Sequence, residues 1–217
     1  MGNTLFVANA TIRLHRHDLP DGLDLGPVVA VDTETMGLDP HRDRLCLVQL
    51  SAGDGTAHLV QLVPEALGGR GYDCPNLKRL LADPQRVKLF HFARFDLTAL
   101  KVTLDVDCAP VYCTKIAAKL VRTFTDRHGL KDLCRELLGI DLSKQQQSSD
   151  WGAETLSQEQ LKYAAADVLY LHQLKEKLDP ILEREGRREL AEGCFGFLPT
   201  RAALDRLGWD QPDIFEH

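Results

Sequence analysis

Long apolar segments are missing from this 217-residue sequence, and so are the other usual signs of a membrane or secreted protein. No hydrophobic run approaches the roughly 20 residues that a membrane-spanning helix needs. The first 17 residues lack the basic flank followed by an apolar core that is typical of a signal peptide. Phe6 stands where an N-myristoylation motif requires serine or threonine. We therefore expect no membrane partner.

Paired cysteines are missing as well. The six cysteines form no C-x-x-C motif and show no spacing typical of a zinc finger. Most stand among apolar neighbours, as Cys46 does in LCLVQL and Cys134 in KDLCREL, which is the usual context of small buried thiols. This pattern favours reduced cysteines in a cytoplasmic protein.

The sequence also lacks an excess of positive charge, since its formal net charge is −6. This value argues against a surface that binds nucleic acid everywhere by electrostatics. It does not exclude a nuclease, since a site built from carboxylates is negative until cations fill it. Lys115, Lys119 and Arg122 recur at helical spacing, and this stripe is either a solvated helix face or a track for phosphates.

The remaining composition is that of a globular protein, with 44% hydrophobic and 27% charged residues. The length predicts one domain over residues 1–217, with a catalytic core at about 28–178 and C-terminal helices over 180–217. Apolar and β-branched runs predict strands over 26–35, 44–51, 56–63 and 87–92, with a weaker fifth over 107–113. Gly53, Asp54 and Gly55 predict a hairpin turn between the second and third strands.

Helical patterns fill most of the second half of the sequence. Helices are predicted over 76–83, 93–101, 114–122, 129–139 and 157–178, with a polar loop over 143–152. Ser157 and Gln160 have the spacing of a capping box, and Pro180 is expected to end the last of these helices. Strands followed by alternating strands and helices indicate a mixed α/β fold around one sheet.

Asp32 and Glu34 directly follow the apolar run VVAV of the first predicted strand. Residues i and i+2 of a strand share a face, with Cα atoms about 6–7 Å apart. Two carboxylates at that spacing can converge on one cation or on a pair about 3.5–4 Å apart. A solvated strand end is the alternative. The buried run favours a cation, because desolvated carboxylates are costly without one.

Two further acids are candidates for the same site. Asp167 lies four residues after Tyr163 in the helix predicted over 157–178, so both occupy one helix face. Asp96 lies in the first turn of the helix predicted over 93–101. Both have ordinary alternatives, because Asp167 could face solvent and Asp96 could simply favour the helix dipole.

A strand end, a strand-to-helix junction and one face of a late helix can meet at one edge of a sheet. A site made only of carboxylate oxygens selects hard cations such as Mg²⁺ or Mn²⁺ over zinc. The expected metal ligands are Asp32, Glu34, Asp96 and Asp167.

These motifs resemble those of the DEDD 3′–5′ exonucleases, a superfamily named for four acids in three motifs. VDTET carries Asp32 and Glu34, HFARFD carries Asp96, and YAAADV carries Asp167. Tyr163 stands four residues before the last acid, as in the tyrosine branch, whereas Lys162 occupies the place of the histidine of the other branch. Over roughly residues 28–178, including TKIAAKLV, SSDWG and LKYAAADVLYL, the sequence is similar to the ribonuclease D family.

The resemblance implies a ribonuclease H-like fold, with a five-stranded mixed sheet flanked by helices. It implies hydrolysis of phosphodiester bonds from the 3′ end of single-stranded RNA with two Mg²⁺ or Mn²⁺ ions. Nucleoside 5′-monophosphates would be released, in RNA 3′-end processing of the tRNA type or in RNA turnover. No residue clearly reads a 2′-hydroxyl, so a 3′–5′ DNA exonuclease is one alternative. A nucleic-acid-binding module without activity is the other, although all four acids and the tyrosine are present.

The resemblance also implies roles for the site residues. Asp32 would bridge both cations, Asp167 would hold the cation that carries the nucleophilic water, and Asp96 would hold the other. Glu34 would bind a cation and help to position the water or the terminal 3′-hydroxyl, while Tyr163 would orient the water.

Substrate contacts are expected from residues near the motifs and from the predicted loop over 143–152. These residues are Thr33, Thr35, His91, Phe95, Lys144, Gln146 and Trp151. His91 and Trp151 could equally be core residues, and Phe95 could be a packing residue.

Two departures from the ribonuclease D pattern bear on the substrate. About 40 residues follow the predicted long helix, so we expect no additional C-terminal helical nucleic-acid-binding domain. Ser148 stands where a basic residue is common in that family.

Overall fold

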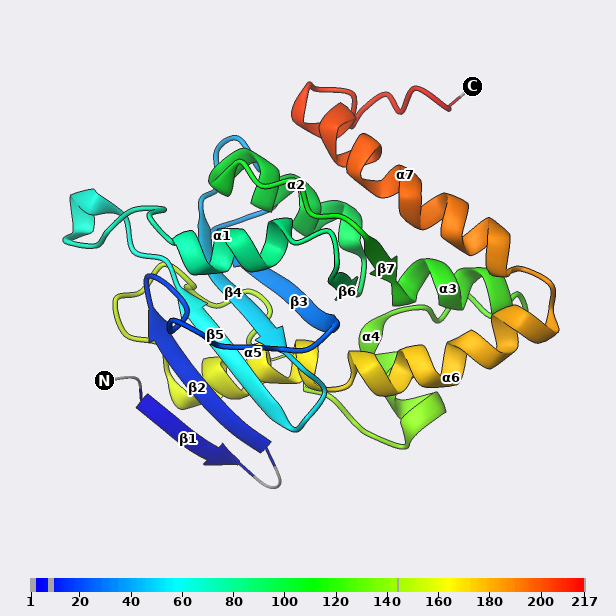
Figure 1. The fold of residues 1–217 in the computed structure, drawn as a ribbon, viewed down its shortest axis with the longest axis horizontal. Coiled ribbons are helices and arrows are strands. Elements are labelled where there is room, and N and C mark those ends of the chain that lie inside the picture. Colours follow the sequence, from blue (N-terminus) through cyan, green and yellow to red (C-terminus); the bar gives the residue numbers. More distant parts are fainter. Residues whose placement is uncertain (1–2, 8–9, 144, 217) are drawn as a thin grey trace.

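The fold is that of a computed structural model, which describes residues 3–7, 10–143 and 145–216. One mixed β-sheet carries helices on both faces, and the long helix α7 leads to the C-terminal segment (Figure 1). The strands are β1 (Asn3–Val7), β2 (Ala10–Arg16), β3 (Val28–Thr35), β4 (Leu45–Ser51), β5 (Thr56–Gln61), β6 (Val87–Phe90) and β7 (Val111–Cys113).

The helices follow mainly in the second half of the chain. They are η1 (Glu65–Leu67), α1 (Pro75–Ala82), α2 (Ala93–Leu104), α3 (Thr114–Val121), α4 (Leu130–Leu133), the π-turn η2 (Cys134–Leu138), α5 (Gln158–Leu169), α6 (Leu171–Arg184) and α7 (Arg188–Arg206). No helix among the described residues is long and apolar enough to cross a membrane.

The strand order β1-β2-β5-β4-β3-β6-β7 places β3 between two neighbours. β3 pairs with β4 in the antiparallel sense and with β6 in the parallel sense. The expected mixed α/β class is confirmed, and the expected hairpin joins β4 and β5. The expected count of five strands is wrong, because the described residues form seven. β1 and β2 were missed although β2, ATIRLHR, alternates apolar and polar residues, and β2 is fixed by a parallel pairing with the distant β5.

The sheet is buried on both faces at its centre. All seven residues of β4 are buried, with α5 on one side of the sheet and α1 and α2 on the other (Figure 1). Apolar side chains on both faces of a strand produce the near-continuous hydrophobic runs that made these strands visible in the sequence.

The helix predicted over 157–178 is wrong in its extent. The structure divides it at Tyr170 into α5 and α6, and α6 continues through Pro180 to Arg184. Its buried face, formed by Leu171, Leu174, Leu178 and Leu182, spans the proline, and all four side chains are fully buried. Proline removes one helical hydrogen bond, but the packing of this apolar face favours continuation of the helix.

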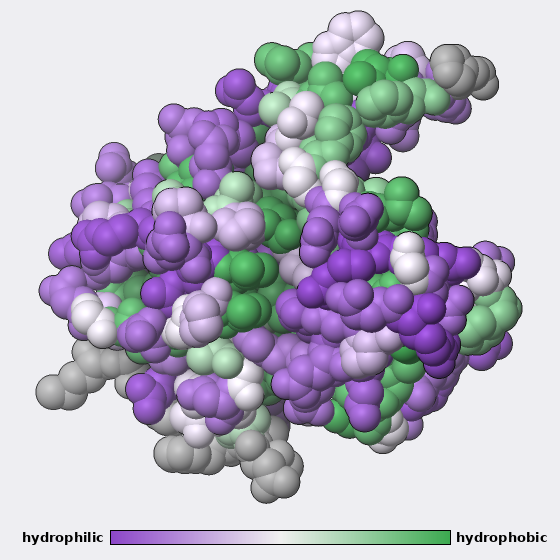
Figure 2. Space-filling model, turned by 45° about the vertical axis from the view of Figure 1, so that its right-hand side comes forward, coloured by the Kyte–Doolittle hydropathy of each residue, from purple (hydrophilic) through white to green (hydrophobic). Residues whose placement is uncertain are grey.

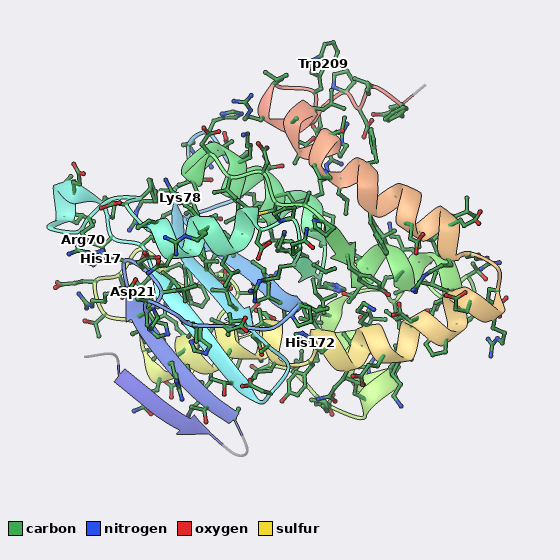
Figure 3. All side chains as sticks on the ribbon, in the orientation of Figure 1. His17, Asp21, Arg70, Lys78, His172 and Trp209 are labelled. Carbon is green, nitrogen blue, oxygen red and sulfur yellow. The ribbon has the colours of Figure 1, made fainter. Side chains whose placement is uncertain are left out.

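Two contacts tie the later helices to the rest of the fold. At the start of α6, the Nε2 atom of His172 lies 3.0 Å from the carbonyl oxygen of Val28, where β3 begins (Figure 3). Arg94 of α2 donates two hydrogen bonds to Asp205 of α7, at 2.7 and 2.9 Å. The chain beyond α7 protrudes from the body and carries the exposed apolar residues Leu207, Ile214 and Phe215 (Figure 2).

Candidate active site

Strand β3 carries Asp32 and Glu34 to the end of a buried strand. Val29, Ala30 and Val31 are fully buried, whereas both acids are partly exposed. Because alternate residues of a strand share a face, the two carboxylates point to the same side of the sheet. This is the arrangement that the D-x-E spacing predicts.

Helix α5 brings Asp167 to the same place. The Ser157 hydroxyl accepts a hydrogen bond from the Gln160 backbone, and the Gln160 side chain accepts one from the Ser157 backbone, so the predicted capping box is confirmed. The small buried residues Ala164 and Ala165 let the helix approach the sheet closely. The carboxylate oxygens of Asp32, Glu34 and Asp167 lie within 4.8 Å of one another.

Asp96 approaches this cluster from the other side of β3. It lies in the first turn of α2 and is 4% exposed. Thr33, between the two acids of β3, donates a hydrogen bond to the Asp96 carboxylate at 2.7 Å. The Thr33 hydroxyl therefore joins the α2 acid to the strand that carries Asp32 and Glu34.

Burial raises the pKa of every acid in the cluster, and the charges of neighbouring acids raise the pKa of Glu34, Asp96 and Asp167 further. Burial raises the pKa of Asp32 to about 7. Burial, together with the charges of Asp32, Asp167 and Asp96, raises the pKa of Glu34 to about 10. Burial and the Asp32 charge also raise the pKa of Asp96 and of Asp167 well above the ordinary value. Four carboxyl groups, Asp96 buried and the other three partly buried, form a site that a cation stabilises.

The donor chemistry fits a hard divalent cation. Among the described residues, no other group of three or more His, Cys, Asp or Glu side chains comes as close together. All the nearby ligand atoms are carboxylate oxygens, which Mg²⁺ and Mn²⁺ prefer and which suit zinc less well. The residues at the end of β3 can therefore hold the ions that the sequence predicts.

Tyr163 lies one helical turn before Asp167 on α5. Burial and the charges of Asp167, Glu34 and Asp32 raise the pKa of the Tyr163 phenol, which keeps its proton at neutral pH. The phenol can then donate a hydrogen bond into the site. Trp151 packs beside it, with ring centroids 6.0 Å apart, and is 3% exposed. The structure thus places Trp151 in the core next to Tyr163, in line with its alternative interpretation.

The other residues predicted to contact the substrate have different environments in the structure. The Thr35 hydroxyl donates a hydrogen bond to the backbone carbonyl of Gly37. Phe95 lines a cavity together with Phe92 and Arg94, and Gln146 is partly buried in the loop before Trp151. Lys144 lies outside the described residues.

His91 has a structural partner in Thr114. The Thr114 hydroxyl donates to the carbonyl of Phe90 at 3.2 Å, so we assign the proton between the two side chains to His91 Nδ1, which lies 2.9 Å from Thr114 Oγ1. Burial, with a smaller effect of the Lys115 charge, lowers the pKa of His91 to about 3. A neutral imidazole therefore joins the end of β6 to the start of α3.

Gln49 is a site residue that the sequence reasoning missed. Its Nε2 atom donates to Asp32 at 3.2 Å, and the side chain is fully buried. The sequence feature that could have indicated Gln49 is a polar amide within the otherwise apolar run LCLVQL. Only the pairing of Asp32 with Gln49 across β3 and β4 shows that this amide faces the acid.

The basic stripe of α3 divides in the structure. Lys119 is exposed, whereas Arg122 is 3% exposed and pairs with Glu136. Lys115 lies with its Nζ atom 4.0 Å from the centroid of the Phe92 ring. The three residues therefore do not form one solvated face. Lys115 and Lys119 line a cavity that is also lined by Ala93 and Arg94 of α2.

Comparison with known proteins agrees with this geometry. A family model described as 3′–5′ exonuclease matches residues 16–183. Ribonuclease D of Granulibacter bethesdensis is 37% identical over 161 residues, which are 74% of this chain and 39% of that protein. DNA polymerase I of Aquifex aeolicus is 34% identical over 160 residues, which are 74% of this chain and 25% of that protein. The chain thus spans about two fifths of the length of the curated ribonuclease D relatives that it matches.

Solved structures extend the likeness to nearly the whole chain. Brucella melitensis NrnC is 57% identical with a TM-score of 0.90, covering 95% of this chain and 98% of that one. Further structures of that protein hold bound Mg²⁺ or pGG, with TM-scores of 0.88 and 0.90. Escherichia coli RNase D, described as an exoribonuclease involved in structured RNA processing, is 27% identical with a TM-score of 0.69, over 81% of this chain and 45% of that one.

The acidic cluster and the Mg²⁺-bound relative together support the use of a divalent metal ion. The family model spans well over half of the sequence and includes all four acids and Tyr163. This chain belongs to the 3′–5′ exonuclease family and, within it, is similar to ribonuclease D.

Proposed function

We propose that this chain is a 3′–5′ exoribonuclease that uses two divalent cations, Mg²⁺ or Mn²⁺, and releases nucleoside 5′-monophosphates. The observation that carries the proposal is the convergence of Asp32, Glu34 and Asp167, whose carboxylate oxygens lie within 4.8 Å of one another. The hydrogen bond from Thr33 to Asp96 supports the inclusion of the fourth acid.

The four acids Asp32, Glu34, Asp96 and Asp167 would hold the cations. When bound, the cations lower the pKa of water and neutralise charge on the attacking and leaving oxygens of an in-line displacement. The acids must lose their protons to act as ligands, so metal affinity rises with pH. Gln49 holds Asp32 and Thr33 holds Asp96 in the orientation that binding requires.

Tyr163 and Glu34 would position the reacting groups. The protonated Tyr163 phenol donates a hydrogen bond to the attacking water and orients it toward the scissile phosphate. Glu34 contributes a ligand oxygen and accepts a hydrogen bond from the water or from the terminal 3′-hydroxyl. Of the remaining predicted contacts, Phe95 is supported by its place in the lining of a cavity of about 560 Å³.

A single-stranded RNA 3′ end is the proposed substrate, in RNA 3′-end processing or turnover. The names of the curated ribonuclease D relatives and the pGG-bound NrnC structure support this choice. DNA is the second candidate, because DNA polymerase I of Aquifex aeolicus also matches this region of the chain. We further propose a cytoplasmic location, which is supported by six free cysteines, five of them buried.

An oligonucleotide assay tests the proposal. RNA and DNA of matched sequence, labelled at the 5′ end, are incubated with Mg²⁺ or Mn²⁺, and each end is blocked in turn. We expect a ladder that shortens from the 3′ end, faster on RNA, that disappears with a 3′ block, with Asp167→Asn or with a chelator. Equal or faster cleavage of DNA would overturn the RNA assignment, and full activity in excess chelator would overturn the metal assignment.

A further inference from the structure

Phe92 has a backbone conformation that is unusual for its residue type. It precedes the first residue of α2 with φ 70° and ψ 44°, in the left-handed region. Among the described residues, only His17 and Asp105 share a positive φ without being glycine. A bulky side chain is strained in this region, whereas glycine adopts it freely. Strained residues of this kind gather at functional sites.

The Phe92 ring is exposed where a core aromatic would be buried. The residue is 48% exposed, and no other aromatic ring among the described residues stacks on it. Its position therefore contributes little to the core, and packing does not account for the strained backbone.

Two cavities meet at this ring. One, of about 560 Å³, is lined by Phe92 and Phe95 of the α2 region, by residues 38–42 and by the end of α7. The other, of about 270 Å³, is lined by Phe92 together with residues of α3 and α7, including Ile116 and Lys119. Phe95 lines the first cavity and directly precedes Asp96 in α2, so this cavity lies along the helix that carries the fourth acid. A nucleic-acid strand that occupies this cavity contacts the ring.

Lys115 supplies positive charge at the same place. Its Nζ atom lies 4.0 Å from the centroid of the Phe92 ring, which is a cation–π contact. The contact orients the ring and leaves its opposite face available. A flat apolar surface beside an ammonium group matches a nucleotide, which combines a flat base with an anionic phosphate.

We propose that Phe92 is a stacking platform for one nucleobase of the substrate and that Lys115 fixes the ring and attracts the neighbouring phosphate. The inference rests on the proposed nuclease function and adds a residue that positions the substrate by its base. A protein partner on the same apolar surface is the rival explanation. The cation at the ring and the neighbouring acid site favour a nucleotide.

Variants of Phe92 separate stacking from a structural role. Phe92→Gly removes the ring and also removes the backbone strain, so its melting temperature should stay equal to that of the wild type or rise. Its KM for an oligoribonucleotide should rise by about 10-fold, in the range of a lost base–aromatic stack, with kcat changed less than about 3-fold. Phe92→Tyr and Phe92→Trp should retain the wild-type KM.

A matched control is present in the same chain. Phe124 is 81% exposed and lies 5.7 Å from the Arg122 guanidinium, so it forms a similar aromatic–cation pair. Phe124 lines neither cavity. Phe124→Gly should leave the KM unchanged.

Substrates with one abasic nucleotide complete the test. An abasic site is placed in turn at each of the three positions nearest the 3′ end. At one position the missing base should raise the KM of the wild type by about 10-fold. The same abasic substrate should not raise the KM of Phe92→Gly any further, because the base and the ring form one interaction.

Each outcome has a defined meaning. A wild-type enzyme that cleaves no oligonucleotide would overturn the proposed function itself. A wild type that cleaves normally, together with an unchanged KM in Phe92→Gly, would overturn only the stacking proposal. A changed oligomeric state in light scattering, without a change in KM, would assign the ring to a protein contact and would likewise overturn it.

Discussion

At the scale of single residues, the four acids of the candidate site oppose folding when no cation is bound. Burial raises the pKa of Asp32 to about 7, above the ordinary value of about 4 that applies in the unfolded chain. Between these values the unfolded state has released its proton and the folded state has not. Stability therefore falls as the pH rises through this window, and the full penalty is present above about pH 7.

Replacement of Asp32 by asparagine removes this penalty. In the absence of metal at pH 8, Asp32→Asn should melt higher than the wild type by about 5 °C, with little difference at pH 4. Thermal unfolding in a chelator measures the effect, with the exposed Asp73→Asn as control. Mg²⁺ should raise the melting temperature of the wild type more than that of Asp32→Asn. A lower melting temperature for Asp32→Asn at pH 8 contradicts the prediction.

Thr33 offers a test of the positioning of Asp96. Thr33→Val keeps the shape of the side chain but removes the hydrogen bond to Asp96. We expect kcat to fall by roughly 10-fold and the Mg²⁺ requirement to rise, as for other residues that hold a metal ligand. Thr33→Ser restores the hydroxyl and should restore both values. If Thr33→Val and Thr33→Ser behave alike, the hydroxyl does not hold Asp96.

The sequence predicts the acids but not the side chains that hold them. Asp32 and Glu34 could be paired from strand periodicity, and Tyr163 and Asp167 from helix periodicity, because both patterns are local. The contacts of Gln49 with Asp32 and of Thr33 with Asp96 depend on strand register and on the approach of α2. These long-range relations leave no local pattern in one sequence.

At the scale of elements, α5 carries both Tyr163 and Asp167, and its first turn is closed by the Ser157 capping box. Ser157→Ala removes the hydroxyl that accepts a hydrogen bond from the Gln160 backbone. The free energy of unfolding should fall by about 1 kcal/mol, which corresponds to a melting temperature lower by about 3 °C.

Urea denaturation measures the cost of the lost cap. Ser143→Ala is the matched control, because Ser143 is an exposed loop residue whose hydroxyl accepts a hydrogen bond from Gln145. An equal loss in both variants would mean that the cap of α5 has no special weight.

Elements fixed by local pattern were predicted well, whereas those fixed by packing were not. The strands over 44–51 and 56–63 and the cap at Ser157 have clear signals and are present. β2 was missed although its sequence ATIRLHR alternates apolar and polar residues, and its place in the sheet depends on the pairing with the distant β5. The continuation of α6 through Pro180 depends on buried leucines whose neighbours lie far away in the sequence.

At the scale of the whole molecule, α7 is fastened to the helix that carries Asp96. Arg94 of α2 and Arg201 of α7 both pair with Asp205, which is 8% exposed. Asp205→Asn would leave two cations, one of them buried, without this counter-charge. The free energy of unfolding should fall by about 3 kcal/mol, the lower limit for a broken buried pair.

Chemical denaturation of Asp205→Asn tests the attachment of α7. Glu192→Gln breaks the exposed pair between Arg188 and Glu192 and should change stability by less than about 0.5 kcal/mol. Equal effects in the two variants would show that the contact between α2 and α7 does not depend on this pair. The attachment could not be predicted from sequence, because it joins charged residues that are 111 positions apart.

Diffraction from crystals grown with Mn²⁺ and a nucleoside 5′-monophosphate, recorded at the manganese absorption edge, tests the two-metal assignment most directly. We expect two anomalous peaks about 3.5–4 Å apart, both within ligand distance of Asp32 and between them in contact with Glu34, Asp96 and Asp167. Peaks elsewhere on the molecule, or none at the end of β3 while the nucleotide is bound, would contradict it.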